Sequence, residues 1–175
     1  MCLLALLVPA VQAQPNSATE YELKAALITK FACYTEWPSN TYTTGNEPIV
    51  IGILGEDPFG KYLVEYAKQP AGEHSLQVRH LSSPSQAADC QVVFISRSES
   101  RHEAAWLAAL SDKPVVTVGE SGHTLERGGI IEFQRVDNRV RFDVNLAAMA
   151  QAGVKFGSGM LQSALHVLKS PEEAQ

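Results

Sequence analysis

Blocks of helical and extended hydrophobic patterning alternate along the chain, beginning with a helix. Residues 20–36 place apolar side chains at helical spacing, which predicts a first helix. Pro38 ends this helix because the residue before a proline avoids the helical conformation. The apolar stripe on the helix consists of Leu23, Ala26, Leu27, Phe31 and Tyr34, with Lys30 among them.

The middle of the chain carries short runs of β-branched or alternating residues, separated by helical patterns. Such runs predict strands, most of them buried. Residues 61–69 predict a helix, and a second helix follows Ser98 or Ser100, either of which can serve as its N-cap. The predicted strands are residues 48–54, 76–81, 91–96 and 114–118.

The last third of the chain has a different pattern. Residues 129–135 and 139–145 predict two strands of a hairpin, because Asp137 and Asn138 between them tolerate the left-handed conformation of a tight turn. Three elements are predicted after the hairpin: a short helix at residues 145–152, an extended piece at 154–156 and a final helix at 158–169.

The order of these elements predicts an α/β fold. Strands that alternate with helices favour one mixed, largely parallel sheet flanked by helices, and the hairpin adds an antiparallel pair near the C-terminal third. With 175 residues, the chain has the length of a single domain.

Composition narrows the possible functions without selecting one. The net charge is −5 and the basic residues are scattered, which argues against nucleic-acid binding. The five histidines never occur at the i, i+4 spacing of two ligands on one helix face, so we expect no metal site. Three cysteines are too few for a disulfide scaffold.

The N-terminus predicts export. Residues 1–13 hold an uncharged apolar run that ends in Val11-Gln12-Ala13, the small-residue pattern of a signal-peptidase site. We therefore expect a signal peptide cleaved after Ala13 and an exported protein. A flexible segment at 14–19, an α/β domain at 20–169 and a frayed tail at 170–175 complete the expected organisation.

No catalytic constellation emerges from the motifs, so we expect neither an enzyme nor a cofactor. Residues 119–122, GESG, lack the residue that a nucleophile elbow needs between its serine and second glycine. Residues 55–60, GEDPFG, lie between a strand and a helix, where open α/β sheets bind ligands. They lack the features of a dinucleotide or phosphate loop. The loop is therefore either a plain turn or a turn that lines a ligand or partner surface.

Two aromatic or charged features have alternative interpretations. Trp37 is either a cap on the core or a partner-binding residue. On the second hairpin strand, Arg141 and Asp143 share a charged face and can pair across it.

Several segments in register resemble the YfiR family. They include YELKAALITKFACYTEWP, IVIGILGEDPFG, ADCQVVFISRSE, PVVTVGES and NRVRFDVNLAAMAQAGVKF, and together they cover roughly residues 20–169. The resemblance implies a dimeric periplasmic repressor. Such a protein binds the periplasmic domain of a membrane GGDEF diguanylate cyclase and lowers cyclic di-GMP and biofilm formation. A peptidoglycan-binding outer-membrane lipoprotein can sequester it.

The chain departs from the family pattern in its cysteines and in its basic residues. The family's first-strand cysteine, which pairs with the cysteine matching Cys90, falls at Gly52 here. A second family pair, around residues 129–133, is also absent. Cys33 and Cys90 are therefore either bridged to each other as a substitute, or they are reduced or intermolecular thiols. Of the family's basic effector positions, which match Glu36, Lys155 and Gly157, only Lys155 keeps its charge.

From these observations we expect a non-enzymatic protein that works by binding other proteins. The alternative is a small-ligand sensor module that works with a sensor kinase or another membrane receptor. The candidate partner-binding residues are Tyr34, Glu36, Trp37, Asp57, Phe59, Arg141, Lys155 and Phe156.

Overall fold

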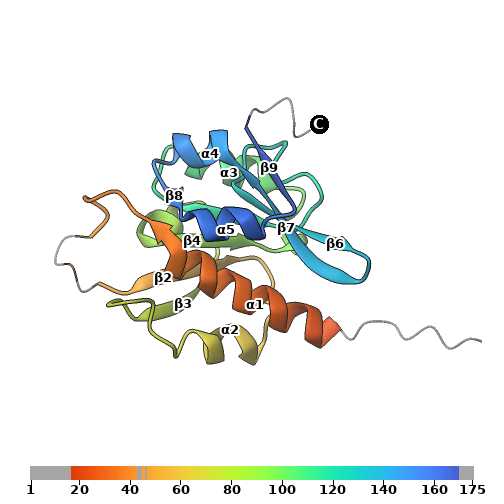
Figure 1. Ribbon diagram of the computed structural model, residues 1–175, viewed down its shortest axis with the longest axis horizontal. Helices are drawn as coiled ribbons and strands as arrows, with labels where there is room; N and C mark the ends of the chain where they lie inside the picture. The colour runs from red at the N-terminus through yellow and green to blue at the C-terminus, as the bar shows by residue number, and fades with distance from the viewer. Residues whose placement is uncertain (1–16, 43–44, 46, 170–175) are drawn as a thin grey trace, which may run out of the picture.

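The computed structural model describes residues 17–42, 45 and 47–169, and within them seven strands form a central sheet in the order β3-β2-β4-β5-β6-β7-β9 (Figure 1). The first five strands in this order are parallel, β7 is antiparallel to β6, and β9 is parallel to β7. The strands are β2 (Ile49–Leu54), β3 (Leu76–Leu81), β4 (Val92–Ile95), β5 (Val116–Gly119), β6 (Ile131–Val136), β7 (Arg139–Asn145) and β9 (His166–Leu168). The predicted mixed, largely parallel sheet is confirmed.

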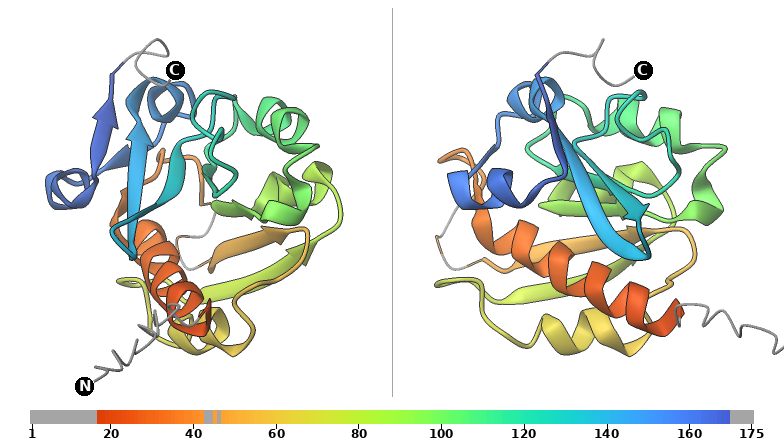
Figure 2. Two further views of the ribbon diagram at one scale, coloured as in Figure 1. Left: turned by 90° about the vertical axis from the view of Figure 1, so that its right-hand side faces the viewer. Right: turned by 45° about the vertical axis from the view of Figure 1, so that its right-hand side comes forward.

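Helices cover both faces of this sheet. Helices α1 (Ser17–Tyr34), α2 (Lys61–Tyr66) and α5 (Ser158–Ser163) pack on one face, whereas α3 (Glu103–Leu110) and the 3₁₀ helix η1 (Pro84–Asp89) pack on the other (Figure 2). Every residue of β2, β4 and β5 is buried, which explains their continuous apolar sequences. The remaining elements are η2 (Arg97–Glu99), α4 (Leu146–Gln151) and a two-stranded antiparallel pair of β1 (Thr35–Glu36) with β8 (Lys155–Phe156).

The core under α1 is rich in aromatic rings. Phe31 is fully buried and contacts the rings of Phe142, Phe133 and Phe156 at centroid distances of 5.0, 6.0 and 6.0 Å. These rings come from α1, β6, β7 and β8, so α1 joins the two-stranded pair to the hairpin strands of the main sheet.

The β6–β7 hairpin forms as predicted. Asp137 and Asn138 have φ angles of 49° and 60°, the left-handed conformation of a two-residue turn that matches the twist of its strands. Asp and Asn adopt this conformation at lower cost than most residues.

Two predictions about helix ends are wrong. Helix α1 begins at Ser17, so residues 17–19 are helical rather than part of a flexible segment. Helix α3 has no serine cap, because the Ser98 hydroxyl instead accepts the N–H of Glu56 at 3.0 Å and holds the loop after β2.

The predicted final helix at 158–169 is also wrong. Helix α5 ends at Ser163, and β9 then pairs with β7. Asp143 accepts the backbone N–H of His166 at 3.0 Å, and Phe142 accepts that of Leu165 at 2.8 Å. Residues 166–168 therefore form a strand on the open edge of β7, because the backbone N–H and C=O groups of that edge need hydrogen-bond partners.

Candidate functional site

Three of the predicted partner-binding residues lie together at the end of α1. Tyr34 is 60% exposed, and the next two residues form β1. Glu36 on β1 lies directly opposite Lys155 on β8, and both are exposed. The short β1–β8 pair thus places an aromatic ring beside one acidic and one basic side chain.

Two of the predicted contact residues are instead core residues, so those predictions are wrong. Phe59 is 1% exposed and packs edge-on against Phe94 at a centroid distance of 4.7 Å. Phe156 is 6% exposed and stacks on Phe31. Both side chains point under α1, where the sheet has room for large rings.

Trp37 and Asp57 make contacts within the fold. Trp37 is half-buried against the core under α1, which supports the interpretation as a core cap. Asp57 accepts the backbone N–H of Phe59 at 2.8 Å, and its other oxygen lies 3.7 Å from His80 Nε2. The loop at 55–60 is therefore a turn stabilised by its own aspartate.

Arg141 lies elsewhere, exposed on β7 opposite Gln134. The expected pairing with Asp143 is not the one observed, because Asp143 accepts from His166 Nδ1 at 3.0 Å. The structure thus distributes the predicted residues over separate places instead of bringing all of them together.

The apolar stripe predicted on the first helix is only partly exposed, because Phe31 is fully buried and Leu27 partly buried. The residues that face the sheet are Ala25, Ile28, Phe31 and Ala32, whereas Leu23 and Tyr34 are 50% and 60% exposed. Helix α1 is apolar on both sides, a property expected of a helix that is covered on both sides. We call the other side the outer face of α1. It consists of the exposed residues Leu23, Lys30, Cys33 and Tyr34 and of the partly buried Ala26 and Leu27, of which Leu27 also packs against the core.

A groove continues this outer face toward α5. It has a volume of about 480 Å³, and Lys30 and Tyr34 form its α1 side. Residues 157–160 and Ser163 form the opposite side. The outer face and this α1–α5 groove together make an exposed apolar surface bordered by Glu36 and Lys155.

The opposite side of α1 contains a buried ionic network at its N-terminal end. Lys24 is 3% exposed, and its Nζ lies 2.6 Å from both Glu20 Oε1 and Glu120 Oε2. The Tyr21 hydroxyl also donates to Glu120, at 3.2 Å. Burial and the Glu120 carboxylate raise the pKa of Tyr21 to about 12, so this phenol stays protonated as a donor.

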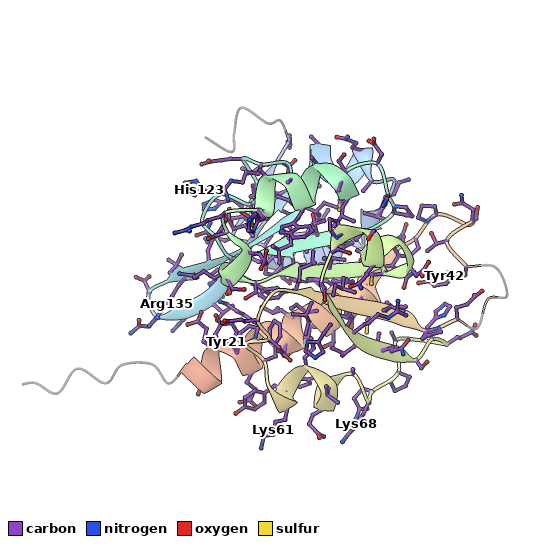
Figure 3. All side chains as sticks on the ribbon, turned by 180° about the vertical axis from the view of Figure 1, so that it is seen from behind. Tyr21, Tyr42, Lys61, Lys68, His123 and Arg135 are labelled. Atoms are coloured by element: carbon purple, nitrogen blue, oxygen red, sulfur yellow. The ribbon has the colours of Figure 1, made fainter. Side chains whose placement is uncertain are left out.

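A cavity of about 480 Å³ opens next to this network. Arg97, which lines this cavity, lies two residues beyond the carboxyl end of β4, so we call the cavity the strand-end cavity. Figure 3 shows that Tyr21 and Arg135 lie at the same end of the molecule, whereas Tyr42 lies at the other end. The cavity is lined by Glu20, Tyr21, Lys24, Arg97, Phe133, Gln134 and Arg135.

A second buried carboxylate, on α3, organises the loop that contains Ser121. Glu103 is 1% exposed and accepts from the hydroxyls of Ser121 and Thr124 at 2.6 and 2.7 Å. Arg127 completes the site, with Nη1 2.6 Å from Glu103. The Ser121 hydroxyl thus holds the loop between β5 and β6 through a carboxylate.

The two described cysteines are free thiols, so of the two alternatives for them the Cys33–Cys90 bridge is not formed. Cys33 is exposed on α1, whereas Cys90 is buried in the core on the other side of the sheet. A Cβ atom built on Gly52 would lie 3.0 Å from Cys90 Sγ. Position 52, where the resemblance places the family's partner cysteine, is therefore adjacent to Cys90.

The described part of the chain has neither a metal-binding cluster nor a membrane-spanning helix. Among residues 17–42, 45 and 47–169, no cluster of three His, Cys, Asp or Glu side chains could hold a metal ion. Within the same residues, no helix combines the length and the apolar character needed to cross a membrane.

Comparisons with known proteins identify a family and a fold. A family model described as YfiR/HmsC-like matches residues 21–164, most of the chain. No curated protein matches the sequence.

Two solved structures share the fold at a TM-score of 0.55. One is the ABC domain in complex with L-Trp from Streptococcus pneumonia, at 11% identity over 82% of this chain. The other is a conserved domain protein from Vibrio cholerae, at 12% identity over 84% of this chain. The match spans 60% of each of those chains, and the low identities limit the comparison to the fold.

Proposed function

Because the chain belongs to the YfiR/HmsC-like family, we propose that it is a periplasmic regulator that binds the sensor domain of a membrane diguanylate cyclase and represses it. The family is regulatory and periplasmic, and its match over residues 21–164 covers every strand of the central sheet except β9. In this function the protein keeps the cytoplasmic GGDEF domain inactive and so lowers cyclic di-GMP and biofilm formation.

The observation that carries a binding role is the apolar outer face of α1. Burying a leucine or an aromatic side chain contributes about 1.5–3 kcal/mol, and α1 leaves Leu23 and Tyr34 at least half exposed. Tyrosine is also enriched among the residues that dominate binding energies. Tyr34 thus serves as the central contact, with Glu36 and Lys155 as the polar rim.

The other predicted residues have smaller roles in this proposal. Trp37, three residues after the end of α1, packs against the core and is not proposed as a partner contact. Arg141 and Asp57 lie on other elements and belong to the rim only for a partner that extends over the β6–β7 hairpin or the strand ends.

Repression follows from a shift in populations. The regulator needs only to bind the inactive form of the cyclase more tightly than the active form, and each 1.4 kcal/mol of preference changes the ratio tenfold. A peptidoglycan-binding outer-membrane lipoprotein would release the cyclase by occupying the same surface. Self-association into a homodimer through this surface would likewise compete with the cyclase.

Deletion of the gene tests the proposal. In a host with a cognate cyclase, deletion raises cellular cyclic di-GMP, and the wild-type gene restores the low level. A gene carrying Tyr34→Asp fails to restore it, because the charge falls in the apolar contact. Val64→Asp is the matched control, since Val64 is a 48% exposed apolar residue on α2. Unchanged cyclic di-GMP after deletion would refute the repressor function.

A further inference from the structure

The strand-end cavity has the size and position of a ligand site. Its volume of about 480 Å³ lies within the roughly 300–1,000 Å³ of small-molecule pockets. Glu20, Tyr21 and Lys24 of α1 form one wall, and residues 133–135 of β6 form another. Arg97 lies just beyond the carboxyl end of β4, and in open α/β sheets ligands bind at the carboxyl ends of strands.

Most charges around the cavity are already compensated. Lys24 lies between the carboxylates of Glu20 and Glu120, and Arg135 Nη1 is 3.6 Å from Glu20 Oε2. Two cations and two carboxylates therefore balance each other.

Arg97 is the remaining cation of the cavity lining. Its Nη2 donates to the backbone carbonyl of Glu120 at 3.0 Å, which anchors the guanidinium at the cavity. Within the described part of the chain, no carboxylate lies within 4.0 Å of this guanidinium. The other N–H donors of this guanidinium are available to a ligand. A cation without a carboxylate partner is notable in a protein whose net charge is −5.

We propose that the strand-end cavity binds a small organic carboxylate, whose anionic group pairs with Arg97. A guanidinium presents parallel N–H donors that match the two oxygens of a carboxylate. One uncompensated positive charge matches a monoanion, and Glu20 in the lining repels a second negative charge. The Tyr21 ring in the wall supplies apolar contact for the rest of the ligand.

The ligand site and the proposed partner surface share one helix. Tyr21 and Lys24 line the cavity, whereas Leu23 and Leu27 belong to the outer face of α1. A bound carboxylate would therefore stabilise the N-terminal half of the helix that carries the partner surface. The ligand proposal does not depend on the cyclase, so its test uses the purified protein alone.

The test compares phenylacetate with its neutral isostere phenylacetamide and with inorganic phosphate, by calorimetric titration and thermal unfolding at pH 7. We expect phenylacetate to bind saturably and to raise the unfolding midpoint, because a ligand of the native state stabilises it. Phenylacetamide binds at least about tenfold more weakly, which is the effect of losing a charged hydrogen-bonded pair. Phosphate also binds more weakly, because it has no apolar part to contact the Tyr21 ring.

Variants of two neighbouring arginines separate the site from general charge effects. Arg97→Gln weakens phenylacetate binding at least about tenfold, whereas Arg101→Gln, which changes an exposed arginine outside the cavity, leaves it unchanged. If Arg97→Gln fails to fold, Arg97→Lys replaces it, because the lysine keeps the charge and loses the paired donors. The proposal is overturned if phenylacetate does not bind wild-type protein below about 5 mM, if the amide or phosphate binds equally well, or if the Arg97 variant binds like wild type.

Discussion

The two faces of α1 differ in what covers them, although both are apolar. On the inner face, Ile28 and Phe31 are fully buried against the sheet, and the charged Lys24 has two carboxylate partners. On the outer face, Leu23 and Tyr34 are half-exposed or more. The inner face therefore contributes to the stability of the fold through buried contacts, whereas we expect the exposed residues of the outer face to contribute little.

The largest expected effect is on the inner face. Phe31→Ala removes the ring that joins α1 to β6, β7 and β8, and we expect a loss of about 3–5 kcal/mol in the free energy of unfolding. Urea unfolding measures this change. Leu23→Asp on the outer face is the comparison and should cost less than about 0.5 kcal/mol. Equal losses in the two variants would contradict the distinction between the faces.

The buried ion pair gives the next largest effect. Lys24→Met leaves the Glu120 carboxylate buried without its cation, and we expect a loss of about 3 kcal/mol. The double variant Lys24→Met/Glu120→Gln removes both charges and should recover part of this loss. A double variant that is less stable than Lys24→Met would contradict the claim that the loss comes from the uncompensated charge of Glu120.

A smaller effect appears at alkaline pH. The pKa of Tyr21 is about 12 in the folded protein and 10.0 ordinarily, so the protonated phenol stabilises the fold below pH 10 and this contribution is lost as the pH rises toward 12. Wild-type protein should therefore lose about 1–2 kcal/mol more than Tyr21→Phe between pH 9.5 and 12. Urea unfolding at several pH values provides the measurement. Parallel losses in the two proteins would show that Tyr21 is not the group responsible.

The sequence patterns identified the elements whose signals are local. The continuous β-branched runs of β2 and β4 and the turn at Asp137 and Asn138 needed only neighbouring residues, and the structure confirms them. Strand β9 had no such signal, because it is determined by the open edge of β7. A helical pattern and a short strand cannot be distinguished in a segment of this length.

The candidate sites are harder to predict, because they also depend on contacts between segments that are distant in the sequence. The stripe on the first helix was visible, but a helix that is apolar on both sides does not reveal which side faces the sheet. Phe59 and Phe156 were expected at the surface, although both rings fill the core under α1. The strand-end cavity was missed because its walls come from three distant segments, and only the fold brings Tyr21, Arg97 and Arg135 together.

The most direct test of the account measures binding between the purified protein and the isolated periplasmic domain of its cognate diguanylate cyclase. Wild type and Val64→Asp should bind with the same Kd, and Tyr34→Asp should bind at least about tenfold more weakly with an unfolding midpoint close to that of wild type. Equal affinity of the Tyr34→Asp and wild-type proteins would contradict the assignment of the outer face of α1 as the partner surface.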